Sequence, residues 1–477
     1  MRDYNFYAQD QWQLSHNFTV NLGLRYEFNR FTQPPENPAY PQTGKLNQPG
    51  HNFAPRVGFA YSLKGGSTVI RGGYGMSYAR LPSASVIRLQ QRNGAVQKTI
   101  FFLPFFADAP KFPGYLLSTD IAGSGSNVTY ADSDLKTPYT EQADLTLEQK
   151  IDNKTVASIS YLWNDGVDFL TRKDDNLVTP TSSYSWRILD ASGNQTGTYT
   201  TPLYTAKHDT SHGTLNHIFN GGRLYYDGLA LSVTRRQSKW LEGSLAYTWS
   251  HSIDLGLGAG ADNIYYTDPP VTVYNNDQRF EKGRSPLDQR HRVVVTALVS
   301  PPRKDFGSRF ANASLNGWQL STLETYASPQ GVDPMVSINA LPAALSHDVY
   351  TSTISGIGIG FASKQRVPFQ PRSSLNLGTT LKTDLRATKE FKLPREESLS
   401  LNFELFNAFN YSTVTSVQQV AIYAYADGVL AGYDTHKSSS TITSTTTPAS
   451  AGTGTASAGF PDGTNARRGQ VSVRFTF

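Results

Sequence analysis

The chain has 477 residues, a net charge of +5 and no cysteine, with 38% hydrophobic and 12% aromatic residues. Its 26 tyrosines and 25 phenylalanines stand beside only 3 methionines. Such a composition is poor for a soluble core and typical of a membrane barrel with aromatic girdles and a wet interior. Without cysteine there is no disulfide or thiolate metal site, and the dispersed Lys and Arg residues argue against a nucleic-acid partner.

Alternating polar and apolar residues begin near the N-terminus and recur along the chain. In residues 17–29 one face carries only apolar side chains, namely Phe18, Val20, Leu22, Leu24, Tyr26 and Phe28. Similar runs centre on Ile159, Leu245, Val295 and Leu401. Each run is about ten residues long, which suits a tilted strand that crosses a bilayer. No stretch of about 18 apolar residues predicts a transmembrane helix.

The connections between these runs alternate in length. Short turns are predicted near Ser15, Lys64, Asp152, Ser238 and Pro394, and a longer one at 301–313. The intervening segments are long: 30–52, 81–138, 166–221, 254–289, 328–376 and 411–465. This alternation predicts an all-β, antiparallel transmembrane β-barrel of about thirteen strands, with short periplasmic turns and long extracellular loops.

The beginning of the sequence shapes the expected domain organisation. No export signal follows Met1, and the first strand must descend toward the periplasm, as must the last, which ends at Phe477. Because complete bacterial barrels have an even number of strands, an odd count with both end strands descending is incomplete. We therefore expect residues 1–477 to be the C-terminal part of an outer-membrane barrel, with the plug domain and the N-terminal strands absent.

Candidate chemical motifs are weak throughout. The glycine-rich stretch 65–75 lacks the Gly-Lys-Ser/Thr of a phosphate loop. The charged run 288–292 has no accompanying nucleophile and fits a polar rim or a lumen wall. The histidines show no metal-ligand spacing, and Asp262 and Asp268 lack the dense carboxylates of a calcium loop. We predict no catalytic, cofactor-binding or metal-binding residue and no enzymatic activity.

Two apolar groups of residues are candidates for binding. Phe101, Phe102, Phe105 and Phe106 lie in a predicted extracellular loop. They either fold back onto the barrel mouth or form an apolar lip that contacts substrate. At the C-terminus, Val471, Val473, Phe475 and Phe477 share one face of the last predicted strand. Such a strand remains an open edge until a barrel closes, and a partner that pairs with it would prevent aggregation.

Several segments, in order, resemble the Oar-like TonB-dependent receptors. They include FYAQDQWQLSHNFTVNLGLRYEF from Phe6, APRVGFAYSLKGGSTVIRGGYGMSY from Ala54, DQRHRVVVTAL from Asp288 and RRGQVSVRFTF from Arg467. The resemblance implies a 22-stranded barrel of which this chain holds the later part. It also implies that Phe477 and the apolar residues before it form the signal for the barrel-assembly machinery, and that TonB binds through a region N-terminal to Met1.

The expected function is uptake of an unidentified large solute by a TonB-dependent receptor in the bacterial outer membrane. The expected partners are outer-membrane lipid, the assembly machinery, TonB and the solute, with no cofactor and no nucleic acid. A passive porin or adhesin-like barrel is the first alternative. A secreted carbohydrate-active β-sandwich enzyme is a distant one, because it would need paired carboxylates that do not stand out in the sequence.

Overall fold

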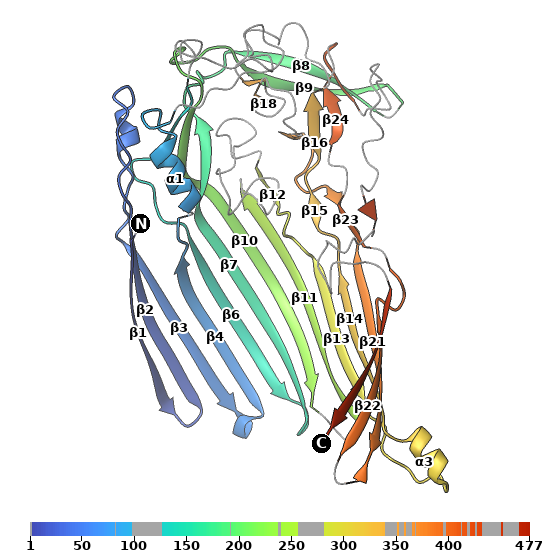
Figure 1. Cartoon of the computed structure of the whole chain (residues 1–477). Helices are drawn as coiled ribbons and strands as arrows, with labels where there is room; N and C mark the ends of the chain where they lie inside the picture. Colours follow the sequence, from blue (N-terminus) through green and yellow to red (C-terminus); the bar gives the residue numbers. More distant parts are fainter. Residues whose placement is uncertain are drawn as a thin grey trace.

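A computed structural model of the chain describes residues 2–81, 83–97, 126–190, 192–236, 240–255, 281–338, 351–352, 357–358, 365–367, 369–394, 397–411, 413–416, 420–424, 427–431, 450–451 and 467–477. The fold is built around one tall, curved sheet (Figure 1). None of the helices in these ranges has the length and the apolar character needed to span a bilayer.

The tall sheet contains thirteen strands in one antiparallel path, each hydrogen-bonded to the next, which confirms the predicted strand number. Two short strands join it off this path: β5 (Val128–Ala131) pairs with β10, and β12 (Lys282–Arg284) pairs with β11. The path is β1 (Arg2–Ser15), β2 (Phe18–Arg30), β3 (Asn52–Leu63), β4 (Thr68–Tyr78), β6 (Tyr139–Lys150), β7 (Thr155–Asp174), β10 (Leu215–Arg235), β11 (Leu241–Leu255), β13 (His291–Val299), β14 (Trp318–Ala327), β21 (Thr380–Lys392), β22 (Ser398–Phe406) and β27 (Arg468–Thr476).

The short connections lie at one end of the sheet, which we call the turn end, together with the connection of intermediate length at 300–317, and the long ones lie at the other, the loop end (Figure 1). At the turn end, η2 (Lys64–Gly66) closes β3 onto β4 with Gly65 at φ 63° and Gly66 at φ 88°, a backbone conformation that glycine adopts without a steric penalty. The sorting of connections by length confirms the prediction from the sequence.

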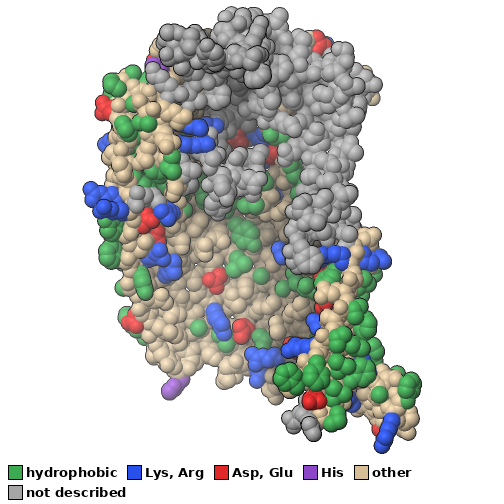
Figure 2. All heavy atoms as spheres, in the orientation of Figure 1, with side chains coloured by type: hydrophobic (Ala, Val, Ile, Leu, Met, Phe, Trp, Pro, Cys, Tyr) green, Lys and Arg blue, Asp and Glu red, His purple; other side chains and the backbone are tan. Residues whose placement is uncertain are grey.

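The two faces of the sheet differ in polarity because successive side chains of a strand point to opposite sides. Register places Leu22 of β2 beside Val57 of β3, and Phe403 of β22 beside Val471 of β27. We call this side the apolar face. Figure 2 looks into the hollow of the sheet. The wall of this hollow is mostly tan, with scattered charged side chains. Hydrophobic side chains gather at lower right, where the strands near the C-terminus curl toward the viewer.

The apolar face carries several carboxylates. Three of them, Asp10, Asp227 and Glu324, accept hydrogen bonds from neighbouring side chains. The Trp12 indole donates to Asp10, and the Tyr161 hydroxyl donates to Asp227 over 2.5 Å. Thr322 donates to Glu324 over 2.9 Å, and Thr383 donates to the same carboxylate. A hydrogen-bonded carboxylate costs much less to place beside apolar groups than an isolated one.

One predicted boundary is wrong. The long segment was expected at 166–221, but β7 continues to Asp174 and β10 begins at Leu215, so their ladder extends well past the expected strand ends. Pairing continues to Asn216 opposite Asp174, with register shifts around Gly222. Backbone hydrogen bonds hold this extension, where both faces carry polar residues and the alternation that marks a membrane strand disappears.

The loop end is a packed assembly with its own small core. Phe31 and Leu46 follow β2, Val86 and Leu89 belong to α1 (Ser83–Gln91), and Ile218 lies on β10, and all five side chains are buried together. The connection 31–51 also contains η1 (Pro41–Gly44), with Thr43 buried. These contacts fix the long connections against the extended part of β10.

A second sheet lies across the top of this assembly (Figure 1). In its hairpin of residues 182–189 and 195–204, Trp186 is fully buried and donates to Thr201 over 3.2 Å. In order, its strands are β18 (Ile357–Gly358), β17 (Thr351–Ser352), β9 (Gln195–Tyr204), β8 (Ser182–Leu189), β25 (Val429–Ala431), β24 (Val420–Ala424), β16 (Met335–Ile338) and β19 (Gln365–Arg366). Two further pairs are β15 (Gly331–Val332) with β20 (Leu375–Asn376) and β23 (Val414–Ser416) with β26 (Ser450–Ala451).

Candidate functional site

The sequence singled out two apolar groups and one charged run. Phe101, Phe102, Phe105 and Phe106 lie outside the described residues. Val471, Val473 and Phe475 lie on the apolar face of β27, and Phe477 follows that strand with its side chain almost fully exposed. The charged run 288–292 lies at the loop end, where it leads from the connection after β12 into the first two residues of β13. It forms part of a buried ionic cluster that joins the tall sheet to the long connections.

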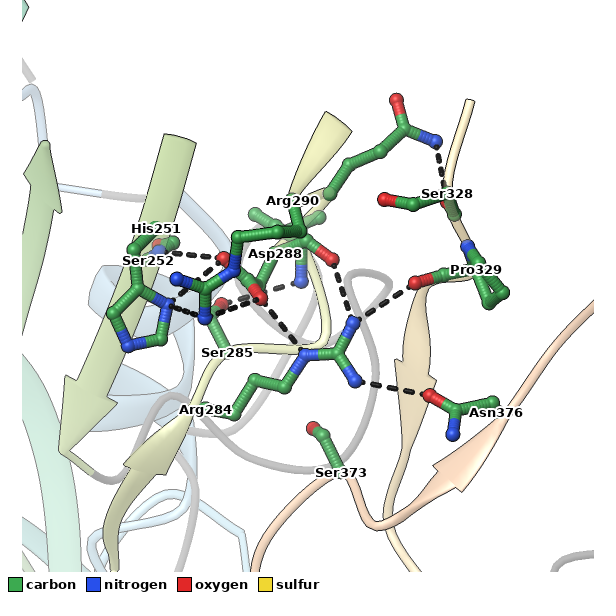
Figure 3. Close-up of polar contacts among 12 residues, drawn as sticks. His251, Ser252, Arg284, Ser285, Asp288, Arg290, Ser328, Pro329, Ser373 and Asn376 are labelled. Atoms are coloured by element: carbon green, nitrogen blue, oxygen red, sulfur yellow. Dashed lines mark hydrogen bonds and ion pairs between the residues drawn. The ribbon is translucent and has the colours of Figure 1, made fainter. Parts of the chain in front are cut away.

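Asp288 is the centre of the first half of this cluster, with its side chain 1% exposed. Its carboxylate accepts from Nε of Arg284 over 2.8 Å and from the backbone N–H of Ser252 over 2.7 Å. His251 Nδ1 lies 3.2 Å away, and the Arg290 guanidinium contacts that same nitrogen over 2.8 Å (Figure 3). One carboxylate thereby ties β11, β12 and the approach to β13 together.

The surroundings of Asp288 determine its protonation state. Burial alone would raise the pKa of this carboxyl, but the Ser252 N–H, Arg284 and His251 together hold the pKa below its ordinary value. Arg284 also reaches across the junction, donating to the Pro329 carbonyl over 2.8 Å and to Asn376 over 3.0 Å (Figure 3). The ionised carboxylate therefore orients an arginine that holds β20 and the start of the 328–376 connection.

Arg372 is the centre of the second half of the buried ionic cluster. Its guanidinium pairs with Asp254 of β11, donates to the Glu281 carbonyl over 2.7 Å, and lies 3.7 Å from the Asp333 carboxylate. The side chains of Arg372, Asp254 and Asp333 are at most 2% exposed. Burial would lower the pKa of Arg372, but the carboxylates of Asp254 and Asp333 raise it above the ordinary value.

Backbone contacts make this half of the cluster compact. Asp333 also accepts from the Ser373 N–H over 2.6 Å, and Ser373 itself has φ 52°. A side chain at Gly331 would lie 2.6 Å from the Ser373 carbonyl, and one at Gly283 would lie 2.7 Å from Cβ of Arg372. Glycine is needed at position 331 because the backbone of Ser373 approaches too closely for a Cβ, and at position 283 because the inner part of the Arg372 side chain occupies the space.

The buried ionic cluster also contacts the second sheet, which we call the upper sheet, through β19. Nη2 of Arg366 lies 3.6 Å from the Glu281 carboxylate, and both side chains are largely buried. The carboxylates in both halves (Asp254, Glu281, Asp288 and Asp333) thus face an equal number of guanidinium groups (Arg284, Arg290, Arg366 and Arg372). With equal numbers of opposite charges, these groups act as a clamp between β11 and the described residues of two connections, the one from β11 to β13 and the one from β14 to β21.

A smaller polar cluster lies on the extended part of β10. Asp175 accepts from the Tyr130 hydroxyl over 2.5 Å, contacts His217 Nδ1 over 2.7 Å and lies 3.1 Å from the Lys173 ammonium. The Tyr130 and His217 rings stack with centroids 4.8 Å apart. Burial and the Asp175 carboxylate raise the pKa of the Tyr130 hydroxyl well above its usual range.

These clusters offer little for catalysis. Within the described ranges, no group of three or more His, Cys, Asp or Glu side chains has the arrangement of a metal site. The acidic side chains of the clamp are each engaged with guanidinium or backbone donors. A cavity of about 510 Å³ does open near the loop end, lined by Asn47, Gln48, Pro49, Gly50, His51, Asn52, Tyr78, Lys136, Thr137, Tyr139 and Asp168.

The sequence alone revealed only part of this clamp. The sequence predicts that the charged run 288–292 lies on the rim or the lumen wall, and Asp288 lies at the rim of the loop end. The sequence analysis does not single out Asp254, Glu281, Asp333 and Arg372, because they are far apart in the chain and no spacing pattern links them. A usable signal was the pairing of Arg284 with Asp288 at a spacing of four residues.

The fold and its polarity agree with the comparison to known families. The family described as "Outer membrane beta barrel domain" matches residues 1–453, and the chain belongs to this family. Its location is the bacterial outer membrane, and barrels of this membrane turn their short connections toward the periplasm. No curated protein matches the sequence.

Several solved structures have a similar course of the chain. The outer membrane transporter YddB from Escherichia coli is 14% identical with a TM-score of 0.46, and the match covers 90% of this chain and 43% of that one. The FrpB iron transporter from Neisseria meningitidis is 12% identical (TM-score 0.43, 86% and 41%), and P. aeruginosa FpvA, solved with pyoverdines, is 11% identical (0.42, 86% and 35%). The chain spans less than half the length of each.

Proposed function

We propose that this chain is the barrel portion of a TonB-dependent receptor that takes up a large solute across the outer membrane. The observation that carries the proposal is the clamp at the loop end. Asp288 and Arg372 hold described residues of two connections, β11 to β13 and β14 to β21, in one ordered assembly above a polar hollow. A receptor needs such a pre-ordered mouth because ordering loops at the moment of binding weakens affinity.

Further parts of the proposal concern the partners. TonB would act through a plug domain that belongs to the complete protein, and energy from the inner membrane would move that plug to admit the solute. Phe101, Phe102, Phe105 and Phe106 would form an apolar lip on the solute path. Phe477, with Val471, Val473 and Phe475, would be bound by the barrel-assembly machinery during insertion. None of these roles requires covalent chemistry by a residue of this chain.

A passive porin is the competing function, and conductance separates the two. The complete protein, purified and inserted into a planar bilayer in concentrated potassium chloride, should conduct very little, because a plug blocks the hollow of a receptor. The purified periplasmic domain of TonB should bind to it. A steady open conductance without TonB binding would instead identify a porin and refute the proposal.

A further inference from the structure

The connection between β13 and β14 is the unusual one at the turn end. It spans residues 300–317, whereas the neighbouring turns close within a few residues. It contains α3 (Arg309–Leu315), whose N-cap Ser308 accepts from the Ala311 N–H over 3.0 Å. No residue of α3 is buried. Figure 1 shows this helix projecting beyond the strand ends at lower right.

A dense set of hydrogen bonds keeps this exposed segment ordered. Asn312 donates to Asp305 over 2.9 Å and accepts from the Phe306 N–H over 2.7 Å. Asn316 accepts from the Lys304 N–H over 2.8 Å and donates to the Lys304 carbonyl over 2.7 Å. A helix this short is unstable by itself, and here polar contacts within the segment, rather than burial, hold its shape.

Two side chains of the tall sheet fix α3 to the apolar side. Trp318 donates through Nε1 to the Ser314 carbonyl over 2.9 Å, and the Lys389 ammonium donates to the carbonyls of Ala313 and Ser314 over 2.5 and 3.0 Å. Trp318 lies opposite Lys389. Both share the face of Leu320, which lies opposite Val299, so both belong to the apolar face.

The exposed side chains of this segment combine apolar and basic groups. Phe310 is 83% exposed, and Leu315 and Phe306 are also exposed. Lys304 and Arg309 are exposed beside them. Asp305, the acidic residue of the segment, is occupied by Asn312 and by the Gly307 N–H over 2.9 Å. The surface offered to the surroundings is therefore aromatic and cationic.

We propose that α3 docks onto the phospholipid surface of the inner leaflet, with Phe306 and Phe310 inserted at the headgroup level and with Lys304 and Arg309 against lipid phosphates. The helix continues the lipid-facing surface of β13, β14 and β21 at its periplasmic margin. Interfacial helices with apolar and basic faces bind membranes in this way. The proposal is independent of the solute and of TonB, since it requires only insertion of the barrel.

Depth-dependent fluorescence quenching tests this docking. Because residues 1–477 contain no cysteine, Phe310→Cys and Asn153→Cys each place a single labelling site in this part of the complete protein. Asn153 lies in the exposed turn after β6, at the same end of the sheet, and is the matched control. In vesicles of phosphatidylethanolamine and phosphatidylglycerol, nitroxides near the top of the acyl chains should quench the label at 310 several-fold more than the label at 153.

A second variant separates the basic side chains from the apolar ones. Arg309→Glu in the Phe310→Cys background should reduce quenching in vesicles that contain phosphatidylglycerol and change it little in phosphatidylcholine alone. Equal exposure of both labels to aqueous iodide would overturn the proposal. Protection of the label at 310 only after a periplasmic extract is added would overturn it as well, because a protein would then cover the helix.

Discussion

Asp254 and Arg372, 118 positions apart in the chain, form an ion pair in which both side chains are almost completely buried. Asp254 belongs to the tall sheet, whereas Arg372 belongs to the connection that precedes β21. Removing one partner would leave an uncompensated charge out of reach of water, which is far more costly than losing an exposed pair. The stability of the loop end should therefore depend on this contact.

Arg372→Met should lower the free energy of local opening at the loop end by about 3–5 kcal/mol. Hydrogen exchange over residues 281–288 and 329–334 would measure the change. The double variant Asp254→Leu/Arg372→Met should recover part of the loss, because it removes both charges. The control Arg187→Met breaks an exposed pair with Asp427 and should cost less than about 1 kcal/mol. Equal effects of Arg372→Met and Arg187→Met would show that the clamp is not structural.

Gly331→Ala should destabilise the same region by about 1–3 kcal/mol, because the added methyl group meets Cβ and the carbonyl of Ser373. Gly197→Ala is the control, since a methyl group at this position of the upper sheet meets nothing within 4 Å. Exchange rates near Ser373 should rise for the first variant alone. Unchanged rates in Gly331→Ala would mean that the two backbones are farther apart than described.

Acid should loosen the Asp288 half of the clamp. The folded-state pKa of this carboxyl lies below its ordinary value, so its contribution to stability is complete above the unfolded pKa and is lost as the pH falls through the folded pKa. Exchange over residues 284–291 should accelerate below about pH 4, the ordinary range of an aspartate. Asp288→Asn should open the region at neutral pH and abolish this step. An unchanged acid response in that variant would assign the step to another group.

The two faces of β10 should respond differently to a charge. Leu231 lies on the apolar face opposite Ile159 and Tyr247, whereas Ala230 points into the hollow opposite Ser160 and Thr248. Leu231→Arg should destabilise the barrel by about 2–4 kcal/mol if this position is near the bilayer midplane, and Ala230→Arg should cost much less. Denaturant unfolding in lipid vesicles gives both values. A larger loss for Ala230→Arg would reverse the assignment of the faces.

Deletion of Phe477 should prevent insertion if this residue is the assembly signal. Its side chain is 96% exposed and stacks on Phe475 with ring centroids 6.1 Å apart, so its loss removes little packing. The complete protein without Phe477 should accumulate in the periplasm and be degraded, while Tyr26→Ala should still reach the outer membrane. Normal outer-membrane abundance of the deletion variant would leave Phe477 as one more girdle aromatic.

The sequence by itself determined the membrane-crossing strands. Polar and apolar residues alternate over residues 17–29 because one face of the strand meets lipid and the other meets water. The pattern within each strand is therefore enough to predict that it crosses the membrane. Connection length likewise predicts that the turn at Lys64 and the long segment 30–52 lie at opposite ends of the sheet, because turns and loops lie on opposite sides of the bilayer. The strand number and the C-terminal face of Val471 and Phe475 followed from the same local rules.

Only the tertiary structure shows how the segments outside the bilayer are arranged, where strands no longer have one face toward lipid and the other toward water. The ladder of β7 and β10 continues past residue 166 because backbone pairing persists where polarity no longer alternates. The pairing of Asp254 with Arg372 and the position of α3 over Lys389 join segments far apart in the chain. Such contacts leave no periodic pattern, because a buried charge is stabilised by whichever partner the fold brings to it.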